Sequence, residues 1–584
     1  MKRILVVALL LAAALPRSLW ADSLSTSGTP SPNDLLDLDS TFVTGVSGVT
    51  DLRWLPDDRM VIITKSGTVY VRPAGGGTPI TAGTFPVNTD SEQGLLGIAV
   101  DPNFTVNRKL YFYYSLANAS GGTNANRHRV VWRTLAANNT LDAGETVILS
   151  GLRGPANHDG GALDIGPDGL LYVGVGDTGN NSGVAPGGTI TNYYGACLSD
   201  DPTNRGGGNG KILRVALDGS IPPSNPLVGA TNVTQCGSGP ATPPDPGRLG
   251  DPRPEIFAWG FRNPFRLWVD PLTGKVWVGD VGEVTYEEVT IVQPGRNHGW
   301  PYREGGQGYP VTQCHDVRIG TGVGNTPIQD GDCVDPVYYC LHGGGAQGID
   351  GGCASVTGGL ILDDCHWPAT IRGQYVFGDN ATDTLWMLTP TPARDGITGP
   401  RIDFGTINGT PVALREGNDG ALYVAVYGGN RIARISPKAP ATCVTTTTSS
   451  TLSGQTTSTS TSTTSTSTTL PGPCGALTNF ALANCQVTPL RSDPLCGSDA
   501  VPAGVVKLVH TRAERAVTLL GKAEAATVDR RKLRLLAQTE RTLKAIAARV
   551  SRAGRKLQIS ADCQSTLGDA VAGARQTVAT LRGL

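Results

Sequence analysis

After its first residues the sequence contains no long uncharged apolar run, and none of its 12 cysteines stands in a CxxC spacing. The first absence leaves only the N-terminus as a candidate membrane or export segment, and the second argues against a zinc site. Aromatic residues are scarce in the basic C-terminal part. Together with export, this scarcity disfavours nucleic-acid binding there.

The N-terminus has the pattern of a secretory signal peptide. Two basic residues precede twelve apolar residues from Ile4 to Leu15, and Ala21 offers a small residue for cleavage before Asp22. The apolar run is too short to span a membrane in the usual way. We therefore expect residues 1–21 to form a signal peptide and the mature protein to be secreted or periplasmic.

The cysteines fall into two even groups on either side of a low-complexity tract. Eight lie between Cys197 and Cys443, and four lie between Cys474 and Cys563. Even counts in an exported protein indicate disulfides within each domain, most of them pinning long insertions. The pairing does not follow from the spacing.

The low-complexity tract separates two regions of opposite charge. Residues 445–470 are almost entirely Thr and Ser, so they cannot bury enough apolar surface to fold, and we interpret them as a linker. Residues 472–584 mix apolar and basic positions at three- and four-residue steps, which predicts a small disulfide-containing helical domain. From Pro471 onward there are 17 Lys+Arg against 8 Asp+Glu. This basic domain is either a solvated surface or a contact with anionic cell-envelope polymers.

The most informative stretch places a histidine just before one predicted strand and an aspartate just after the next. His158 precedes the first apolar run, a Pro167-Asp168-Gly169 turn follows it, and Asp177 ends the second run. In a hairpin both polar groups emerge at the same end. The pattern predicts that His158 and Asp177 lie together as a base and its orienting carboxylate.

The same hairpin pattern recurs, which indicates the fold class. Repeated units of this kind, with irregular insertions between them, predict an all-β, six-bladed β-propeller over residues 35–443. A pair of β-sandwiches is the alternative, although six matched hairpins exceed what one sandwich requires. With the hairpin around Pro167, the copies lie at residues 50–64, 96–114, 265–280, 359–379 and 412–426.

A series of short motifs runs through the predicted propeller. In order, they are Glu92-Gln93-Gly94-Leu95-Leu96-Gly97, Asn157-His158-Asp159-Gly160-Gly161, Gly166-Pro167-Asp168-Gly169, Trp259-Gly260-Phe261-Arg262-Asn263-Pro264, Gly279-Asp280-Val281-Gly282 and Gly295-Arg296-Asn297-His298-Gly299-Trp300-Pro301. The series resembles the motifs of the soluble glucose/sorbosone dehydrogenase family, six-bladed propellers that use pyrroloquinoline quinone, and the resemblance covers roughly residues 35–440. It implies a secreted quinoprotein that oxidises the anomeric hydroxyl of an aldose sugar to a lactone and passes electrons to an external acceptor.

The resemblance implies a role for each matching residue. His158 corresponds to the general base that takes the hydroxyl proton of the sugar, and Asp177 corresponds to the carboxylate that holds its imidazole. Arg262 corresponds to the arginine beside the quinone carbonyl, where a positive charge stabilises the oxyanion formed on reduction. The remaining roles are cofactor support for Asn263, sugar contacts for Gln93 and Asn157, and calcium binding through the backbone carbonyls of Gly282 and Glu283.

Other interpretations of these residues and of the whole chain stay open. Asp177 and Asp280 could cap their own turns, Arg262 could pair with a carboxylate, and packing is the expected role of His298. Glucose-oxidising members bind the quinone carboxylates through a lysine where this chain has Ala381, and through arginines in a stretch that lacks them here, at residues 407–412. The fifth hairpin resembles the hedgehog-interacting-protein branch, so a propeller that binds a protein or a surface glycan is one alternative function. A calcium-dependent, lactonase-like hydrolase is the other.

Overall fold

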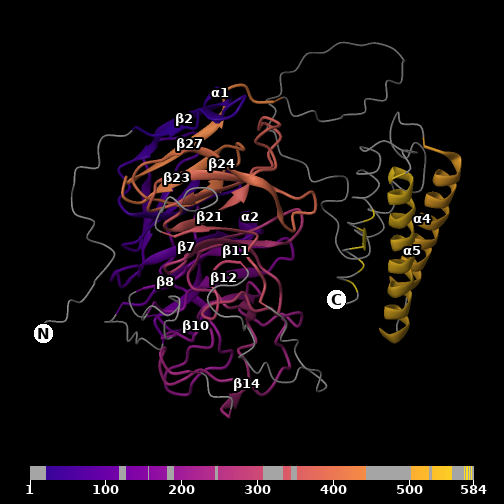
Figure 1. Cartoon of the computed structure of the whole chain (residues 1–584), viewed down its shortest axis with the longest axis horizontal. Coiled ribbons are helices and arrows are strands. Elements are labelled where there is room, and N and C mark those ends of the chain that lie inside the picture. Colours follow the sequence, from indigo (N-terminus) through magenta and orange to yellow (C-terminus); the bar gives the residue numbers. More distant parts are fainter. Residues whose placement is uncertain are drawn as a thin grey trace, which may run out of the picture. The chain divides into compact units, whose positions relative to one another are not determined.

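The computed structural model describes residues 21–117, 126–154, 157–179, 190–243, 247–306, 333–342, 352–441, 501–524 and 529–555, with isolated residues from 571 to 581. The predicted linker and nearly all of the predicted signal peptide lie outside these residues. The chain divides into two compact units, Met1–Thr447 and Thr448–Leu584, which are described separately (Figure 1).

The hairpin around Pro167 shows how the sequence builds each repeat. The turn closes because the N–H of Gly169 donates to the carbonyl of Gly166 at 2.9 Å, with Gly169 in the left-handed region at φ 74°. The Asp168 carboxylate accepts from the Leu170 N–H at 3.2 Å and from the Tyr172 hydroxyl at 2.9 Å. A glycine and an Asx contact therefore fix the turn that the sequence predicted.

The first unit contains six antiparallel sheets of four or five strands, which we number as blades 1 to 6 in chain order. Each of the six predicted hairpins forms the two innermost strands of one blade. Blades 1 to 3 consist of β3 (Val49–Trp54), β4 (Met60–Thr64), β5 (Thr68–Arg72) and β6 (Ile80–Thr84); β7 (Leu95–Val100), β8 (Lys109–Ser115), β9 (His128–Thr134) and β10 (Thr146–Leu152); and β11 (Leu163–Ile165), β12 (Leu171–Val175), β13 (Lys211–Val215) and β16 (Ile256–Trp259).

Blades 4 to 6 repeat the arrangement, and two short helices and a small ribbon complete the described part of this unit. Blade 4 consists of β17 (Pro264–Val269), β18 (Val276–Asp280), β19 (Tyr286–Ile291) and β20 (Tyr338–Leu341), and blade 5 of β21 (Val356–Ile361), β22 (Tyr375–Asp379), β23 (Thr384–Pro390), β24 (Ile397–Thr406) and β1 (Ser23–Leu24). Blade 6 consists of β25 (Pro411–Glu416), β26 (Leu422–Val426), β27 (Arg431–Pro437) and β2 (Leu36–Thr44). The helices are α1 (Pro32–Leu35) and α2 (Phe104–Asn107), and the ribbon is β14 (Val233–Thr234) with β15 (Leu249–Gly250).

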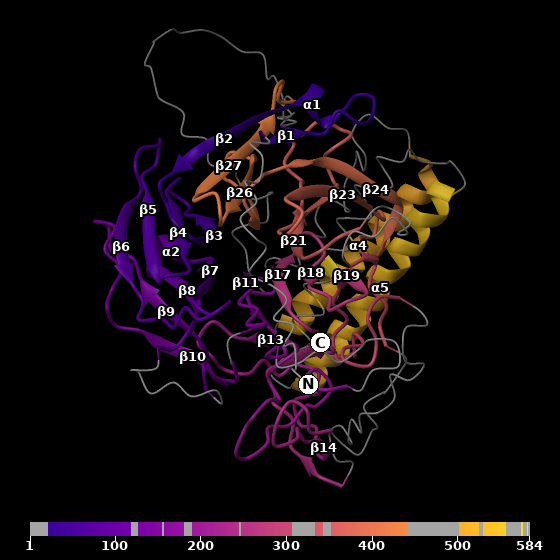
Figure 2. The same cartoon turned by 60° about the vertical axis from the view of Figure 1, so that its left-hand side comes forward.

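The innermost strands form a closed ring. Strand β3 contacts β7, β7 contacts β11, and the series continues through β17, β21 and β25 back to β3. A ring of six sheets is a six-bladed β-propeller, so the sandwich alternative is wrong. Figure 2 shows blades 1 and 2 in indigo and purple on one side, with β2 beside β27.

The N-terminal segment closes the ring. Strand β2 pairs antiparallel with β27 as the outer strand of blade 6, and β1 pairs with β24 at the edge of blade 5. Asp22 accepts a hydrogen bond from the N–H of Asn408 at 2.9 Å and forms an ion pair with Arg431 at 2.9 Å. Strand β1 thus lies ahead of residue 35, the position at which the propeller was expected to begin.

The second strand of most blades is buried along its length. Strands β4, β12, β18, β22 and β26 bury every residue because each sheet is covered on both faces by its neighbours. Two disulfides lie among the described residues: Cys197–Cys236 joins the insertion of blade 3, and Cys340–Cys353 joins β20 to the segment before β21. The prediction of disulfides within the propeller is confirmed for these four cysteines.

The second unit contains a helical pair. Helices α4 (Ala503–Glu524) and α5 (Asp529–Arg555) pack through Val509, Ala516, Leu543 and Ile546, all of which are buried. Their spacing of three and four residues is the pattern that predicted helix. No described helix is long and apolar enough to cross a membrane.

Candidate active site

His158 and Asp177 meet at one end of the β11–β12 hairpin, as predicted. The Nδ1–H of His158 donates to Asp177 Oδ1 at 2.7 Å, and the two side chains are 9% and 1% exposed. Among the described residues His158 Nε2 has no hydrogen-bond partner. A neutral imidazole held through Nδ1 offers Nε2 as the proton acceptor.

The backbone at this pair is tightly constrained. His158 has φ 51°, a left-handed conformation that a histidine adopts at a cost of about 1–3 kcal/mol. A Cβ on Gly176 would lie 1.9 Å from the His158 carbonyl oxygen and 3.1 Å from Asn263 Oδ1. Only glycine at position 176 therefore allows the segment that follows β12 to approach the histidine this closely.

Asp177 is held on both carboxylate oxygens. Trp300 Nε1 donates to Oδ2 at 2.7 Å, and the Gly179 N–H donates to Oδ1 at 2.9 Å. Burial alone would raise the pKa of Asp177, but the neighbouring His158, the positive charge of Arg262 and the Gly179 N–H hold the pKa below its ordinary value. Asp177 is therefore a fixed carboxylate that orients the imidazole.

Arg262 lies beside this group. Its guanidinium carbon is 5.6 Å from the centroid of the Trp300 ring, and its Nη1 donates to the Val281 carbonyl at 2.9 Å. Its Nε is buried without a hydrogen-bond partner among the described residues. No described carboxylate forms an ion pair with Arg262, so the simple pairing considered from the sequence is not observed in that part of the chain.

Asp280 supports the turn that carries Arg262. Its carboxylate accepts from the N–H groups of Arg262 at 3.1 Å and Asn263 at 2.7 Å. Burial raises the pKa of Asp280 to about 7. Asp280 therefore binds the turn of Arg262 and Asn263 and not its own turn, whereas Asp177 accepts from the N–H of Gly179 in its own turn.

Asn263 and Glu92 contact each other and the backbone of the segment that follows His158. Asn263 Oδ1 accepts from the Gly160 N–H at 3.2 Å, and its Nδ2 donates to Glu92 Oε2 at 3.2 Å. Glu92 Oε2 also accepts from the Asp159 N–H at 3.3 Å, whereas Oε1 has no partner among the described residues. Burial raises the pKa of Glu92 although His158 and Arg262 both oppose this shift electrostatically. Glu92 was not among the site residues expected from the sequence, where its only signal was its place beside Gln93.

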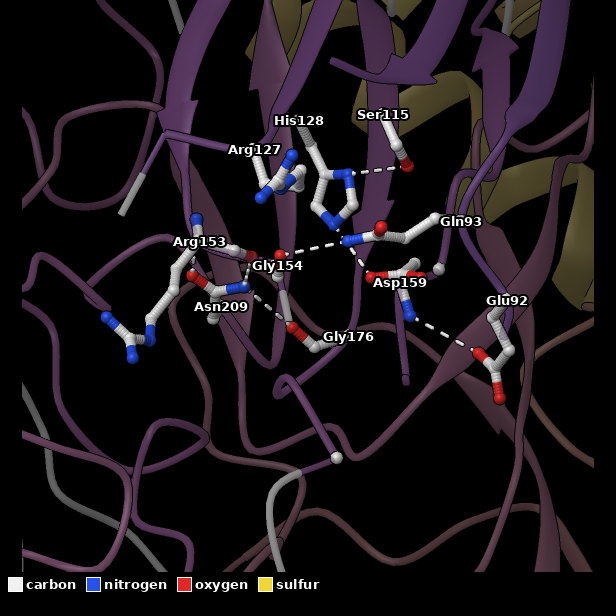
Figure 3. A network of polar contacts seen from close by, with 12 residues as sticks. Glu92, Gln93, Ser115, Arg127, His128, Arg153, Gly154, Asp159, Gly176 and Asn209 are labelled. Atoms are coloured by element: carbon white, nitrogen blue, oxygen red, sulfur yellow. Dashed lines mark hydrogen bonds and ion pairs between the residues drawn. The ribbon is translucent and has the colours of Figure 1, made fainter. Parts of the chain in front are cut away.

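Gln93 points into the protein. Figure 3 shows its amide directed to the Gly154 carbonyl, which it contacts at 3.0 Å, and its Oε1 accepts from Asn88 at 2.6 Å. The Gln93 side chain is 2% exposed. None of its described contacts tests the predicted contact with a sugar, which therefore stays a prediction. Asn157 is half-buried, and a Cβ on Gly179 would lie 2.8 Å from its Cβ.

Behind Gln93 lies a second, fully buried histidine pair. His128 Nε2 contacts Asp159 Oδ1 at 2.8 Å, and its Nδ1 contacts Ser115 Oγ at 3.1 Å (Figure 3). His128 and Ser115 are 0% exposed and Asp159 is 2% exposed. This network joins blade 2 to the segment that carries His158, and it has no access to a substrate.

Gly282 and Glu283 follow β18, close to two buried carboxyl groups. Glu304 accepts from the N–H of Glu283 and, at 3.1 Å, from the N–H of Thr285. Glu288 accepts from the N–H of Gly305. Burial raises the pKa of both Glu288 and Glu304.

The same face of blades 5 and 6 differs in charge from the Arg262 side. Asp379 accepts backbone N–H groups from Ala354 and Ala381 at 2.7 and 3.0 Å. At the approach to blade 6, Arg431 is the nearby cation, and it donates to the Asn408 carbonyl while paired with Asp22. His298 is buried and stacked on Phe261 at 4.7 Å, and burial lowers its pKa to about 3, in line with the expected packing role.

Together these contacts create a site with a defined chemistry. The His158 imidazole, the fixed Asp177 carboxylate and a partly buried arginine from the next blade lie at one end of the propeller. In this arrangement His158 can take a proton from a bound hydroxyl while Arg262 stabilises negative charge on a second ligand.

Comparisons with known proteins agree with this description. Residues 48–338 match the model of the Glucose / Sorbosone dehydrogenase family. Residues of this chain are 30% identical to an uncharacterized protein of Synechocystis sp. over 271 residues, which is 44% of this chain and 58% of the relative. They are 25% identical to the HIPL1 protein of Arabidopsis thaliana over 413 residues (64% and 54%) and 27% identical to quinoprotein glucose dehydrogenase B of Acinetobacter calcoaceticus over 264 residues (43% and 49%). The chain thus spans about half the length of these curated relatives.

Solved structures show the same fold. A putative oxidoreductase (glucose dehydrogenase) from Thermus thermophilus aligns with a TM-score of 0.51 at 24% identity, covering 68% of this chain and 99% of that protein. At this identity the likeness shows the fold alone.

Proposed function

Residues 48–338 belong to the glucose/sorbosone dehydrogenase family, and from this premise we propose that the propeller oxidises the anomeric hydroxyl of an aldose sugar to a lactone. The observation that carries the proposal is the His158–Asp177–Trp300 series with Arg262 against the same tryptophan. An external electron acceptor would complete the cycle outside the cytoplasm.

The residues of the chain have separate tasks in this reaction. His158 Nε2 takes the proton of the anomeric hydroxyl, and the Nδ1 bond to Asp177 keeps the tautomer that allows it. Asp177 stabilises the imidazolium that results, while Trp300 keeps the carboxylate from rotating. Asn157 and Gln93 remain the proposed sugar contacts, together with the free oxygen of Glu92.

Pyrroloquinoline quinone, when bound, would supply the acceptor that takes the hydride from the anomeric carbon, which thereby becomes the lactone carbonyl. The site fits this group on the side of Arg262, whose buried Nε has no partner among the described residues. Arg262 and Asn263 would hold it there. On the side of blades 5 and 6, Ala381 offers no charge, so we expect weaker binding than a full set of cations would give.

We also propose that a calcium ion binds through the backbone carbonyls of Gly282 and Glu283. The donors in this region are carbonyl and carboxylate oxygens, including Glu304, which the Glu283 N–H contacts. Calcium prefers six to eight oxygen ligands, so the donor chemistry fits the ion.

The test is reconstitution of the purified protein with quinone and calcium. The proposal predicts that titration of pyrroloquinoline quinone gives a saturable absorbance change that calcium strengthens. It also predicts reduction of an artificial electron-accepting dye that depends on an added aldose. Saturable binding without turnover of any aldose in a broad panel would contradict the dehydrogenase.

A propeller that binds a protein or a surface glycan is the second candidate. The observation that favours it is the rim of blade 5, where Asp379 binds backbone N–H groups and Ala381 leaves no cation for a cofactor carboxylate. The HIPL1 relative aligns over more of this chain than the glucose dehydrogenase does. Failure to bind the quinone at all would favour this function.

The helical unit supports a separate contact with anionic cell-envelope polymers. Exposed basic residues lie along both helices, including Lys507, Lys522, Arg534, Arg541 and Lys544. Such a surface attracts polyanions in a manner that salt weakens. Cosedimentation of the whole protein with isolated cell envelopes, lost when salt is raised, is the expected result, and retention in high salt would contradict an electrostatic contact.

A further inference from the structure

Lys211, at the start of β13, is a buried cation that forms no ion pair with a described carboxylate. Its side chain is 0% exposed, and its Nζ donates to three backbone carbonyls: Tyr194 at 2.7 Å, Gly195 at 3.1 Å and Asn209 at 2.7 Å. Three acceptors match the three donors of an ammonium group, whereas a neutral amine would leave one carbonyl unsatisfied. Burial holds the pKa of Lys211 well below its ordinary value. The three carbonyl acceptors oppose this shift because they favour the ammonium form, and on this geometry we treat Lys211 as a cation.

The carbonyls that Lys211 binds belong to the segments that support Asp177. Asn192 Nδ2 donates to the Asp177 carbonyl at 3.0 Å and, through Oδ1, accepts from the Tyr194 N–H at 3.2 Å. Gly195 lies against Trp300, because a Cβ there would be 2.9 Å from Cδ1 of the indole ring. One ammonium therefore fixes a loop that touches Asp177 directly and touches the tryptophan that binds its carboxylate.

The third carbonyl leads to the same residue from the other side. Asn209, whose carbonyl Lys211 binds, donates from Nδ2 to the carbonyls of Arg153 at 2.7 Å and Gly176 at 3.0 Å (Figure 3). The Gly210 N–H also donates to the Gly176 carbonyl, at 3.1 Å. Gly176 immediately precedes Asp177, so Lys211 links both flanks of the carboxylate.

We propose that Lys211 is a positioning residue for the His158–Asp177 pair, acting as a covalently tethered cation that holds the 192–195 loop and the 209–210 turn around Asp177. It contacts neither substrate nor cofactor. Its effect on turnover rests on the proposed function, whereas its effect on the loop does not.

The test uses Lys211→Ala in the full chain, with added ammonium ions as the probe. The variant leaves a cavity of about the size of the lost side chain, lined by three carbonyls without a hydrogen-bond donor. A free ammonium ion can enter this cavity and donate to the three carbonyls. We expect kcat to fall about 10²-fold with KM little changed, because the acceptor base loses its alignment. Ammonium chloride should restore part of kcat and raise Tm, relative to sodium chloride at equal ionic strength.

The matched control is Arg214→Ala in the same strand. Arg214 is also a buried cation that binds a loop, donating to Asn225 Oδ1 at 2.8 Å and the Ser224 carbonyl at 2.9 Å, but it lies near the Asp168 turn at the other end of the hairpin. Its loss should lower Tm, leave kcat unchanged and give no response to ammonium. Lys211→Met, which fills the space, should lose kcat without ammonium rescue.

Three outcomes overturn the proposal. They are wild-type kcat in Lys211→Ala, equal loss of kcat in Lys211→Ala and Arg214→Ala, and absence of any ammonium-specific gain in kcat or Tm. If the wild-type protein turns over no sugar, the dehydrogenase function fails. The ammonium-specific Tm gain then still decides whether the carbonyl cage, formed by the carbonyls of Tyr194, Gly195 and Asn209, binds a cation. Should Lys211→Ala not fold in sodium chloride, folding restored by ammonium supports the cage and its failure overturns it.

Discussion

At the scale of single residues, the site depends on residues whose conformations are fixed by hydrogen bonds and close contacts. Asp177 has hydrogen bonds on both oxygens, and His158 is held in a left-handed backbone conformation by its close contact with Gly176. The sequence predicted the His158–Asp177 pair because a hairpin places both at one end. It did not indicate that Trp300 binds Asp177, because 123 residues separate them and no local pattern links the two.

Substitutions at the neighbouring residues Glu92 and Gln93 should differ in their effect on stability. Gln93→Ala removes a buried amide that binds the Gly154 carbonyl, so we expect a loss of about 1–3 kcal/mol in the free energy of unfolding. Glu92→Gln keeps the side-chain shape and should change KM for the sugar with little effect on Tm. Denaturant unfolding and steady-state kinetics measure the two effects. The sugar contact proposed for Gln93 predicts in addition a higher KM for Gln93→Ala, and an unchanged KM would contradict that contact.

Glu416, at the end of β25, should make stability depend on pH. Burial raises its pKa from 4.5 to about 7, although Trp367 Nε1 donates to it at 3.2 Å. Between these values the unfolded chain releases the proton and the folded chain keeps it, so wild-type stability falls as pH rises. Glu416→Gln retains the acceptor for Trp367 and lacks this titration. Its Tm advantage should therefore widen between pH 4.5 and 7.5, and a constant difference across this range would show that folding does not raise the pKa of Glu416.

At the scale of elements, the hairpins could be predicted and the closure of the ring could not. Each hairpin involves residues close together in the sequence, and turns such as Pro167-Asp168-Gly169 can be recognised from their residue types. Strand β2 instead pairs with β27, nearly the whole length of the propeller away in sequence, and Leu36–Thr44 alternates without any feature that specifies its partner. Non-local strand pairing leaves no signal in one sequence.

The innermost strands of blades 1 and 6 are joined by a buried ion pair. Arg415 on β25 donates to both oxygens of Asp51 on β3, at 2.9 and 2.8 Å, and the two side chains are 5% and 0% exposed. Arg415→Met leaves Asp51 charged and buried, so we expect a loss of about 3–5 kcal/mol in unfolding free energy. The double variant Asp51→Leu/Arg415→Met should recover part of it in a double-mutant cycle. A loss in the double variant equal to the sum of the losses in Asp51→Leu and Arg415→Met would contradict coupling between the blades.

At the scale of the whole molecule, two units share one chain, and residues 442–500 between their described parts lie outside the described structure. The Thr/Ser tract predicts that limited proteolysis cuts between Cys443 and Cys474 and releases a β-rich fragment and a helical fragment. Circular dichroism of the separated fragments checks that each stays folded. Unfolding of the released propeller would place the domain boundary elsewhere.

The most direct test of the account is the turnover of His158→Gln compared with the wild-type protein, both reconstituted with pyrroloquinoline quinone and calcium. Glutamine removes the proton acceptor and leaves Arg262 and its contacts untouched, so quinone affinity and Tm should stay close to wild type. Aldose-dependent dye reduction should fall by about 10²–10⁴-fold, the range expected for loss of a general base. Equal turnover in the two proteins would contradict the assignment of His158 as the base and, with it, the dehydrogenase mechanism.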